Sequence, residues 1–308
     1  MGDEDRFCEA CGADLPVGPA ASMPVEPEVA GCVTCGGAVG DDGYCGVCGL
    51  KQPDPHDREE LDLGWAAGVS DRGLHHPTNE DAMFLSAPRP GMAVAVVCDG
   101  VSSSSNAMAA AGAAARAAGP VLLDTAGTDP KAAIAEAAAA AQQAVIAVPR
   151  VGDGESPSCT FVAAALRDGE LTVGWLGDSR AYWLSPSGNR RLTTDDSWAA
   201  MQVDAGVLTE EAAEADPRAH SITGWLGADA PVAVPRVTQI ELAGPGRVVV
   251  CSDGLWNYAS DADRLAGLLE GSPPDAVGAA RHLAQFALDS GGHDNITVVV
   301  LAVGERTP

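Results

Sequence analysis

Short apolar runs separated by turn residues dominate the chain from residue 63 onward. Nine of them are four to eight residues long and rich in Val, Ala and Leu, which is typical of buried strands. They cover residues 65–70, 83–86, 93–98, 160–167, 171–176, 181–184, 237–242, 248–251 and 296–303. Consecutive runs are joined by turn sequences such as Arg-Asp-Gly-Glu at 167–170, so we expect antiparallel hairpins.

Alanine-rich segments predict the helices, because Ala has the highest helix propensity. They cover residues 106–118, 130–147, 198–205, 260–270 and 274–289. Two long helices follow one another in the first half and two more in the second, so strands and helices do not alternate regularly. This order predicts an α+β fold in which antiparallel sheets are flanked by helices.

Three stretches divide the chain. Residues 1–49 contain six of the nine cysteines, the polar stretch 50–62 predicts a linker, and residues 63–304 hold the predicted strands and helices. The N-terminus is acidic and lacks an apolar signal region, and no apolar run is long enough to span a membrane. The sequence therefore predicts a cytoplasmic protein with no membrane partner.

The charge balance narrows the range of partners. The chain has 43 acidic and 18 basic side chains and a net charge of −25. Nucleic acid binding requires Lys and Arg to neutralise phosphates, so this composition argues against it. The excess of carboxylates favours solubility, and it also supplies ligands for metal ions.

Two Cys-x-x-Cys pairs lie nine residues apart and predict a metal site. Cys32 and Cys35 form the first pair and Cys45 and Cys48 the second, and a glycine follows each pair. Glycine allows tight turns that point backbone amides at thiolate sulfurs, and four thiolates suit tetrahedral Zn²⁺. We expect one structural zinc in a closed zinc ribbon, which either only folds this module or also docks a protein partner.

A third pair, Cys8 and Cys11, has no second pair of its own. Three interpretations stay open: a ribbon whose first pair lies upstream of Met1, a zinc site shared with another chain, or a vestige. We favour the first, which would bring a second zinc. The remaining cysteines are isolated in apolar surroundings and are interpreted as core residues.

Acidic residues recur where predicted strands begin or end. Asp99 and Asp253 each follow an apolar strand, Asp294 precedes one, Asp178 lies between two, and Asp81 precedes the run at 83–86. An isolated Asp-Gly is usually only a turn. A set of carboxylates that converges on one site repels itself unless cations neutralise it, and oxygen ligands suit Mg²⁺ or Mn²⁺.

The order of these motifs resembles the PPM-type (type 2C) protein phosphatases over residues 63–304. The matching motifs are Ser70-Asp71-Arg72-Gly73, Asn79-Glu80-Asp81-Ala82, Cys98-Asp99-Gly100, Gly177-Asp178-Ser179-Arg180-Ala181, Leu192-Thr193-Thr194-Asp195, Ala205-Gly206-Val207-Leu208-Thr209, Ser252-Asp253-Gly254-Leu255-Trp256 and Asp294-Asn295-Ile296-Thr297-Val298. The resemblance implies a four-layer αββα sandwich of two mainly antiparallel sheets.

It also implies two Mn²⁺ or Mg²⁺ ions, or three, bridged by the water that attacks phosphoserine or phosphothreonine in proteins. By motif match, Asp99 bridges two metals, Asp253 and Asp294 hold the first, and Glu80 and the Gly100 carbonyl hold the second. Asp81 lies close by, and Asp178 shares a third metal with Asp253. The implied role is in signal transduction, with phosphorylated proteins as substrates.

The chain departs from the family pattern at three positions. His76 stands where many members have an arginine that clamps the phosphate, and imidazole cannot donate in the same bidentate way. No histidine follows Gly100, and Asn257 replaces another acidic ligand. The segment 196–220 is expected to form a flap beside the site.

Two functions compete. The first is an active phosphatase in which Asp99, Asp253, Asp294 and His76 serve catalysis. The second is a pseudophosphatase or scaffold that binds partners through the zinc ribbon. A decayed enzyme would have lost one of the metal-binding aspartates, and all of them are present, so the sequence favours the enzyme.

Overall fold

The computed structural model describes residues 31–40, 43–52, 54–124, 129–152, 154–230 and 233–304. The chain divides into two compact units, Met1–Asp54 and Pro55–Pro308. The predicted ligands Cys8 and Cys11 lie outside the described residues. No helix in the described ranges is long and apolar enough to cross a membrane.

Two large antiparallel sheets form the centre of the second unit. The first has the order β1-β2-β13-β12-β8-β9, and the second has the order β11-β7-β6-β4-β3. The first comprises β1 (Arg58–Asp62), β2 (Ala66–Asp71), β13 (Ile296–Val303), β12 (Gly246–Cys251), β8 (Arg180–Leu184) and β9 (Arg190–Arg191). The second comprises β11 (Arg236–Glu241), β7 (Glu170–Leu176), β6 (Phe161–Arg167), β4 (Met92–Asp99) and β3 (Asp81–Arg89). A separate short pair joins β5 (Ser158–Cys159) to β10 (Leu226–Gly227).

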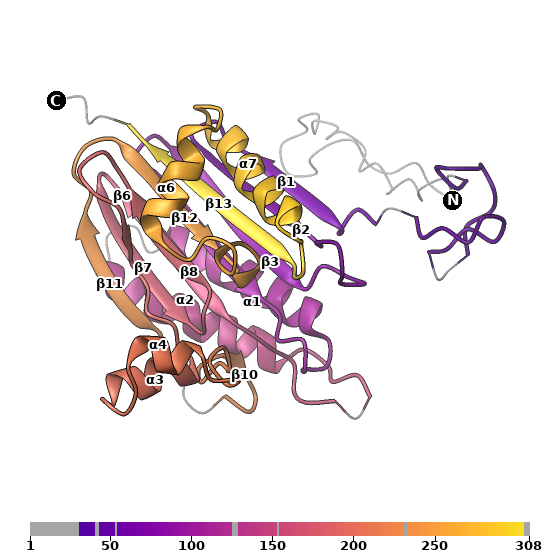
Figure 1. The fold of residues 1–308 in the computed structure, drawn as a ribbon, viewed down its shortest axis with the longest axis horizontal. Coiled ribbons are helices and arrows are strands. Elements are labelled where there is room, and N and C mark those ends of the chain that lie inside the picture. The colour runs from indigo at the N-terminus through magenta and orange to yellow at the C-terminus, as the bar shows by residue number, and fades with distance from the viewer. Residues whose placement is uncertain are drawn as a thin grey trace, which may run out of the picture. The chain divides into compact units, whose positions relative to one another are not determined.

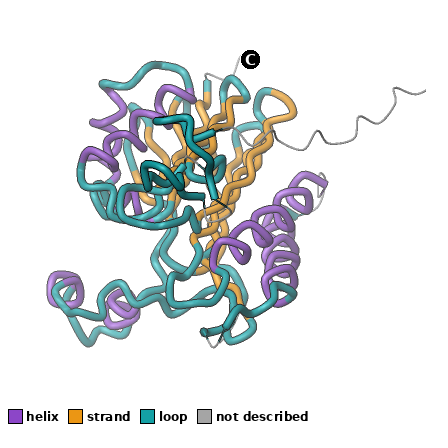
Figure 2. The backbone as a smooth tube through the Cα atoms, turned by 90° about the vertical axis from the view of Figure 1, so that its right-hand side faces the viewer, coloured by secondary structure: helices purple, strands orange, loops and turns teal. Residues whose placement is uncertain are grey.

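Helices cover the outer faces of both sheets. Helices α1 (Ala107–Asp124) and α2 (Pro130–Ile146) pack on the second sheet, and α5 (Asp253–Trp256), α6 (Ala262–Glu270) and α7 (Ala276–Asp289) pack on the first. Figure 1 shows α6 and α7 in front of the strands and α1 and α2 behind them. In the turned view of Figure 2 the strands lie between the two groups of helices. This layering confirms the predicted αββα sandwich.

Strand β4 explains why the strands appear as unbroken apolar runs in the sequence. Val94, Val96 and Cys98 pack against the α1–α2 layer, whereas Ala93 and Val97 pack between the two sheets. Successive side chains of a strand point to opposite faces, so a strand that is covered on both sides carries no polar alternation. The acidic residues lie at the ends of such strands, as Asp99 does at the end of β4.

The structure differs from the sequence-based prediction at several elements. The predicted linker 50–62 is too long, because Arg58–Asp62 forms strand β1, which pairs with β2 along its whole length. Helix α1 continues beyond 118 to Asp124 despite Pro120, since this extension buries Leu122. The short helices α4 (Glu210–Glu214) and α5 were not predicted, whereas α3 (Trp198–Asp204) was.

Candidate active site

The two sheets bring the predicted carboxylates together at one edge. Asp99 ends β4, and Asp81, the first residue of β3, lies directly opposite it in the antiparallel register. Asp253 begins α5 immediately after β12, and Asp294 lies just before β13, the strand beside β12. Asp178 lies in the turn between β7 and β8. Each strand end therefore contributes one carboxylate to the same region.

A glycine permits the close approach of two of these segments. A Cβ on Gly254 would lie 2.0 Å from the carbonyl oxygen of Asn295, which is closer than any real side chain comes. Any larger residue would push α5 away from the loop before β13. Gly254 is therefore required for Asp253 and Asp294 to share one site.

Ser252 positions the buried carboxylate of Asp81. Its Oγ donates to Asp81 Oδ2 at 2.7 Å and accepts from the backbone N–H of Thr297 at 3.0 Å. The Ser252 side chain is fully buried. The sequence placed Ser252 in a motif but gave it no role, because a serine before Asp-Gly carries no signal of its own.

Asn295 ties the loop of Glu80 to the loop before β13. Its Oδ1 accepts from the Glu80 N–H at 2.8 Å, and its Nδ2 donates to the carbonyls of Arg72 at 2.7 Å and Thr78 at 3.0 Å. Asn295 is 3% exposed, so these hydrogen bonds are shielded from water. The sequence gave this residue no role either.

Burial and mutual repulsion strongly perturb the carboxylates. Burial, together with the charges of Asp81 and Asp253, raises the pKa of Asp99 well above its usual value. Burial likewise raises the pKa of Asp81 to about 7, of Asp178 to about 8 and of Asp253 to about 6. Such a set cannot ionise fully at neutral pH without a compensating positive charge.

Two oxygen atoms in this cluster indicate where a compensating positive charge would bind. Asp81 Oδ1 and Asp253 Oδ1 are buried and have no hydrogen-bond partner among the described residues. Buried carboxylate oxygens are costly unless they are paired or bind a metal. Hard divalent cations prefer oxygen ligands, so the donor set fits Mg²⁺ or Mn²⁺.

His76 lies at the open side of the cluster. Its Nε2 is 3.2 Å from Asp294 Oδ1, and the side chains of His76 and Asp294 are 27% and 40% exposed. Burial raises the pKa of Glu80, and the nearby His76 opposes that shift. The N–H of Gly100, the other predicted ligand here, donates to the Glu80 carbonyl at 3.2 Å. The histidine thus contacts the partly exposed carboxylate of Asp294 at the solvent-facing side of the cluster.

An ion pair on the other side of the cluster was not predicted. Arg180 Nε and Nη2 donate to the two carboxylate oxygens of Asp195 at 2.9 and 2.5 Å. The Arg180 guanidinium lies 3.6 Å from the centre of the Trp256 ring, and that ring tilts against His220 at 6.0 Å. Residues of β8, α5 and the flap segment therefore meet beside Asp253.

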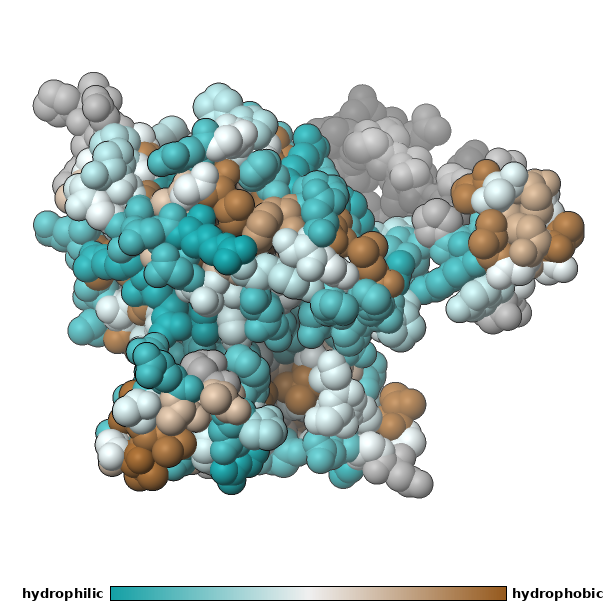
Figure 3. All heavy atoms as spheres, in the orientation of Figure 1, coloured by the Kyte–Doolittle hydropathy of each residue, from teal (hydrophilic) through white to brown (hydrophobic). Residues whose placement is uncertain are grey.

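The predicted flap, 196–220, contains α3 and α4 and has a small core of its own. Ala199, Ala213 and Ala219 are buried together in it. Asp196 fixes the start of this segment, since its Oδ2 accepts from the Gly177 N–H at 3.1 Å. Apolar side chains of this segment remain exposed, as the brown spheres at the lower left of Figure 3 show over α3 and α4. They include Met201 at 48% and Val207 at 64% exposure.

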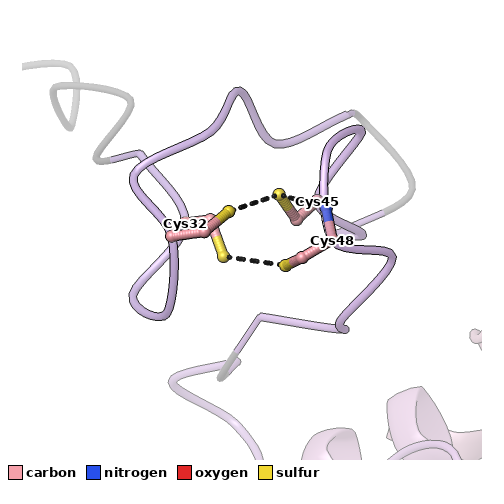
Figure 4. Close-up of side chains that lie close together, drawn as sticks. Cys32, Cys45 and Cys48 are labelled. Atoms are coloured by element: carbon pink, nitrogen blue, oxygen red, sulfur yellow. Dashed lines mark hydrogen bonds between the residues drawn. The ribbon is translucent and has the colours of Figure 1, made fainter.

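The first unit holds the four cysteine sulfurs within 4.8 Å of one another. Cys32 Sγ lies 3.6 Å from Cys48 Sγ, and Cys35 Sγ lies 3.5 Å from Cys45 Sγ. A disulfide would require about 2.05 Å, so the cysteines are unbonded thiols. Figure 4 shows Cys32 on one turn of the chain facing Cys45 and Cys48 on another.

Backbone amides stabilise the thiolate form of Cys45. The N–H groups of Cys48 and Val47 point at its sulfur at 3.5 and 3.4 Å, and they lower its pKa. Gly36 and Gly49 have φ angles of +73° and +72°, which places the glycine after each pair in the left-handed region. Four cysteine sulfurs clustered within 4.8 Å of one another suit a divalent metal such as zinc.

Comparisons agree on the class of protein that this fold and carboxylate cluster define. A family model described as protein phosphatase 2C matches residues 74–286, and the chain belongs to this family. The family comprises metal-dependent serine/threonine protein phosphatases.

Individual phosphatases are also similar to this chain in sequence and in structure. The chain is 31% identical over 247 residues to the serine/threonine protein phosphatase PstP of Mycobacterium tuberculosis, covering 80% of this chain and 46% of PstP. A crystal structure of that phosphatase matches with a TM-score of 0.64 and 29% identity, covering 78% of this chain and 98% of the other. A PstP catalytic domain in complex with two manganese ions matches with a TM-score of 0.59 and 28% identity, with the same coverage. The chain spans about half the length of the curated relatives it matches.

Proposed function

We propose that the chain hydrolyses phosphoserine and phosphothreonine in proteins, using divalent cations held by the carboxylate cluster. The observation that carries this proposal is the convergence of five aspartates with two buried oxygens that lack partners. The names of the relatives support the same activity. No observation favours the scaffold alternative, since every predicted metal-binding aspartate is retained.

The proposed ligand sets are those that the resemblance to the family implies. Asp99 would bridge two Mn²⁺ or Mg²⁺ ions, Asp253 and Asp294 would hold one, and Glu80 with the Gly100 carbonyl would hold the other. A third ion at Asp178 is part of the same proposal. When bound, the cations supply a nucleophilic water at neutral pH and screen the phosphoryl charge. The PstP complex with two manganese ions supports the number of two.

The protein's own groups would orient the reaction. Ser252 holds the carboxylate of Asp81, and Asn295 holds the backbone that carries Glu80, so both are positioned before substrate arrives. His76 would hold the phosphoryl group, a role that requires its Nε2 to exchange Asp294 for a phosphoryl oxygen. Cys98 and Cys251 are fully buried, and burial raises the pKa of both thiols, so neither serves as a nucleophile.

We also propose that the four cysteines of the first unit bind one structural zinc. Among the described residues, Val33 and Val47 next to the cysteine turns are 74% and 75% exposed, which supports a second role in docking a protein partner. Cytoplasmic location remains a proposal.

The test is hydrolysis of a phosphothreonine peptide with Mn²⁺, with Mg²⁺ and with chelator, in the wild type and in Asp253→Asn. The matched control is Asp289→Asn, since Asp289 ends α7 and only accepts from Gln285 at 2.8 Å. We expect cation-dependent turnover that falls at least 100-fold in Asp253→Asn and is unchanged in the control. Folded wild-type protein without turnover in excess Mn²⁺ would refute the enzyme and leave the scaffold.

A further inference from the structure

A cavity of about 600 Å³ opens beside the carboxylate cluster. Three parts of the second unit line it: the turn from β8 into β9, the flap segment, and the connection from α5 to α6. Asn257 belongs to its lining and donates to Asp253 Oδ2 at 3.1 Å. The side chain of Asn257 therefore lies between the cavity and Asp253, a proposed metal ligand.

The inner wall of the cavity contains a buried donor. Trp256 is 3% exposed, and its Nε1–H has no hydrogen-bond partner among the residues that the structure describes. The Arg180 guanidinium stacks on the same indole ring and also lines the cavity. An indole N–H is only a donor, and leaving it buried without an acceptor is unfavourable. The N–H itself is shielded from the cavity, so the wall that a ligand meets is the stacked pair of Arg180 and Trp256.

The rim of the cavity is basic. Arg190 and Arg191 are both exposed there, and His220 of the flap lines the same cavity. Arg191 Nη1 reaches Asp195 Oδ2 only at 3.9 Å, and within the described ranges the Arg190 side chain has no ion-pair partner. Such a concentration of basic side chains is unusual in a chain with 43 acidic and 18 basic residues.

Two acidic residues also line the cavity, and they do not cancel this charge. The Asp261 carboxylate is occupied at the start of α6, where it accepts from the N–H groups of Asp263 at 2.9 Å and Arg264 at 3.0 Å. Glu210 belongs to the flap and is exposed. Asp195 neutralises Arg180, so Arg190 and Arg191 are the positive charges that the rim offers to a ligand.

We propose that this cavity binds a second anionic group of the phosphoprotein substrate, either a carboxylate side chain or a second phosphoryl group. The inference rests on the proposed phosphatase function and narrows its substrates to sites with an acidic residue close by. Because Asn257 lines the cavity and also contacts Asp253, the two anionic groups would lie close together along the peptide. Arg190 and Arg191 are the residues that determine this specificity.

The experiment measures kcat/KM in saturating Mn²⁺ for phosphothreonine peptides whose neighbouring positions carry alanine, aspartate or phosphoserine. A small chromogenic phosphomonoester is the reference substrate. The proteins are the wild type, Arg190→Gln/Arg191→Gln, Trp256→Phe, and the control Arg116→Gln, which removes an exposed positive charge from α1. The readout is the ratio of kcat/KM between the acidic and the alanine peptides.

We expect the wild type to prefer an acidic peptide by about tenfold, as charge-assisted hydrogen bonds predict. The double variant should lose this preference, Trp256→Phe should reduce it, and Arg116→Gln should keep it. The aspartate and phosphoserine peptides show which anion is preferred. Equal rates on all peptides, or a preference that survives in the double variant, would overturn the inference while the phosphatase stands. No hydrolysis of any substrate by the wild type would overturn both.

Discussion

The buried ion pair between Arg180 and Asp195 allows a quantitative test of how this side of the site is held together. The side chains of Arg180 and Asp195 are 5% and 12% exposed, and the carboxylate binds the guanidinium through both oxygens. In Asp195→Asn the arginine would stay buried without its counter-charge. Removing one partner of a buried pair costs about 3–5 kcal/mol. For a domain of this size that corresponds to roughly 6–20 °C in the unfolding midpoint.

The assay is urea unfolding with linear extrapolation, supported by thermal unfolding. A double variant, Arg180→Met/Asp195→Leu, separates pairing from packing, because it removes both charges and keeps apolar bulk. We expect the double variant to be more stable than Asp195→Asn, since no unpaired charge remains.

The chain supplies a matched control for exposure. Arg89 and Asp168 form a similar two-point pair at 2.8 and 2.9 Å, but their side chains are 53% and 69% exposed. Arg89→Met should therefore leave the unfolding midpoint unchanged, because water already solvates both charges. If Asp195→Asn were as mild as Arg89→Met, or if the double variant were worse than the single one, the reasoning from burial would be wrong.

Three further predictions concern the glycine contact, pH and the cysteines. Gly254→Ala should lower the free energy of unfolding by about 2–4 kcal/mol and abolish turnover, since its Cβ would meet a backbone oxygen at 2.0 Å. The control Gly267→Ala in α6 has nothing within 4 Å of the added Cβ, so it should be neutral or stabilising. Chemical unfolding measures both. Without bound cations, burial raises the pKa values of Asp81 and Asp178 from 3.8 to about 7 and about 8. The folded state then binds more protons than the unfolded state between these values. In chelator, stability should therefore fall as the pH rises from about 4 to 8. Thermal unfolding at several pH values tests this, and Mg²⁺ should remove most of the loss. Cys32→Ser should release the zinc, measured by elemental analysis, and leave the unfolding of the second unit unchanged.

Much of the sandwich could be predicted from the sequence because its strands are buried on both faces. The run 93–98 is apolar throughout and 296–303 is apolar except for Thr297, and the structure places strands over both. The alanine-rich segment 130–147 also predicted α2 to within one residue, and the structure adds the Asp129 cap at its first turn. The short helix α5 was missed because one turn contains too few residues to show a period.

The candidate site was only partly predictable for a physical reason. Each carboxylate lies where a strand begins or ends, and this is visible along the chain. The contacts that hold the carboxylates are not, because Ser252 reaches Asp81 across 171 positions and Asn295 reaches Glu80 across 215. Nothing local in the sequence marks such residues as supports, and the same holds for Arg180 beside Trp256.

Strand β1 carries a consequence for how these molecules behave toward each other at high concentration. Among the strands that the structure describes it pairs with β2 alone, so its other side presents backbone donors and acceptors to any approaching chain. Its sequence is Arg-Glu-Glu-Leu-Asp, and Glu59 and Asp62 are exposed. A second copy that tried to extend the sheet here would bring its own acidic strand against them, in a protein of net charge −25. The polar sequence of β1, which is why the hydrophobic pattern did not predict this strand, thus disfavours edge-to-edge association into fibrils.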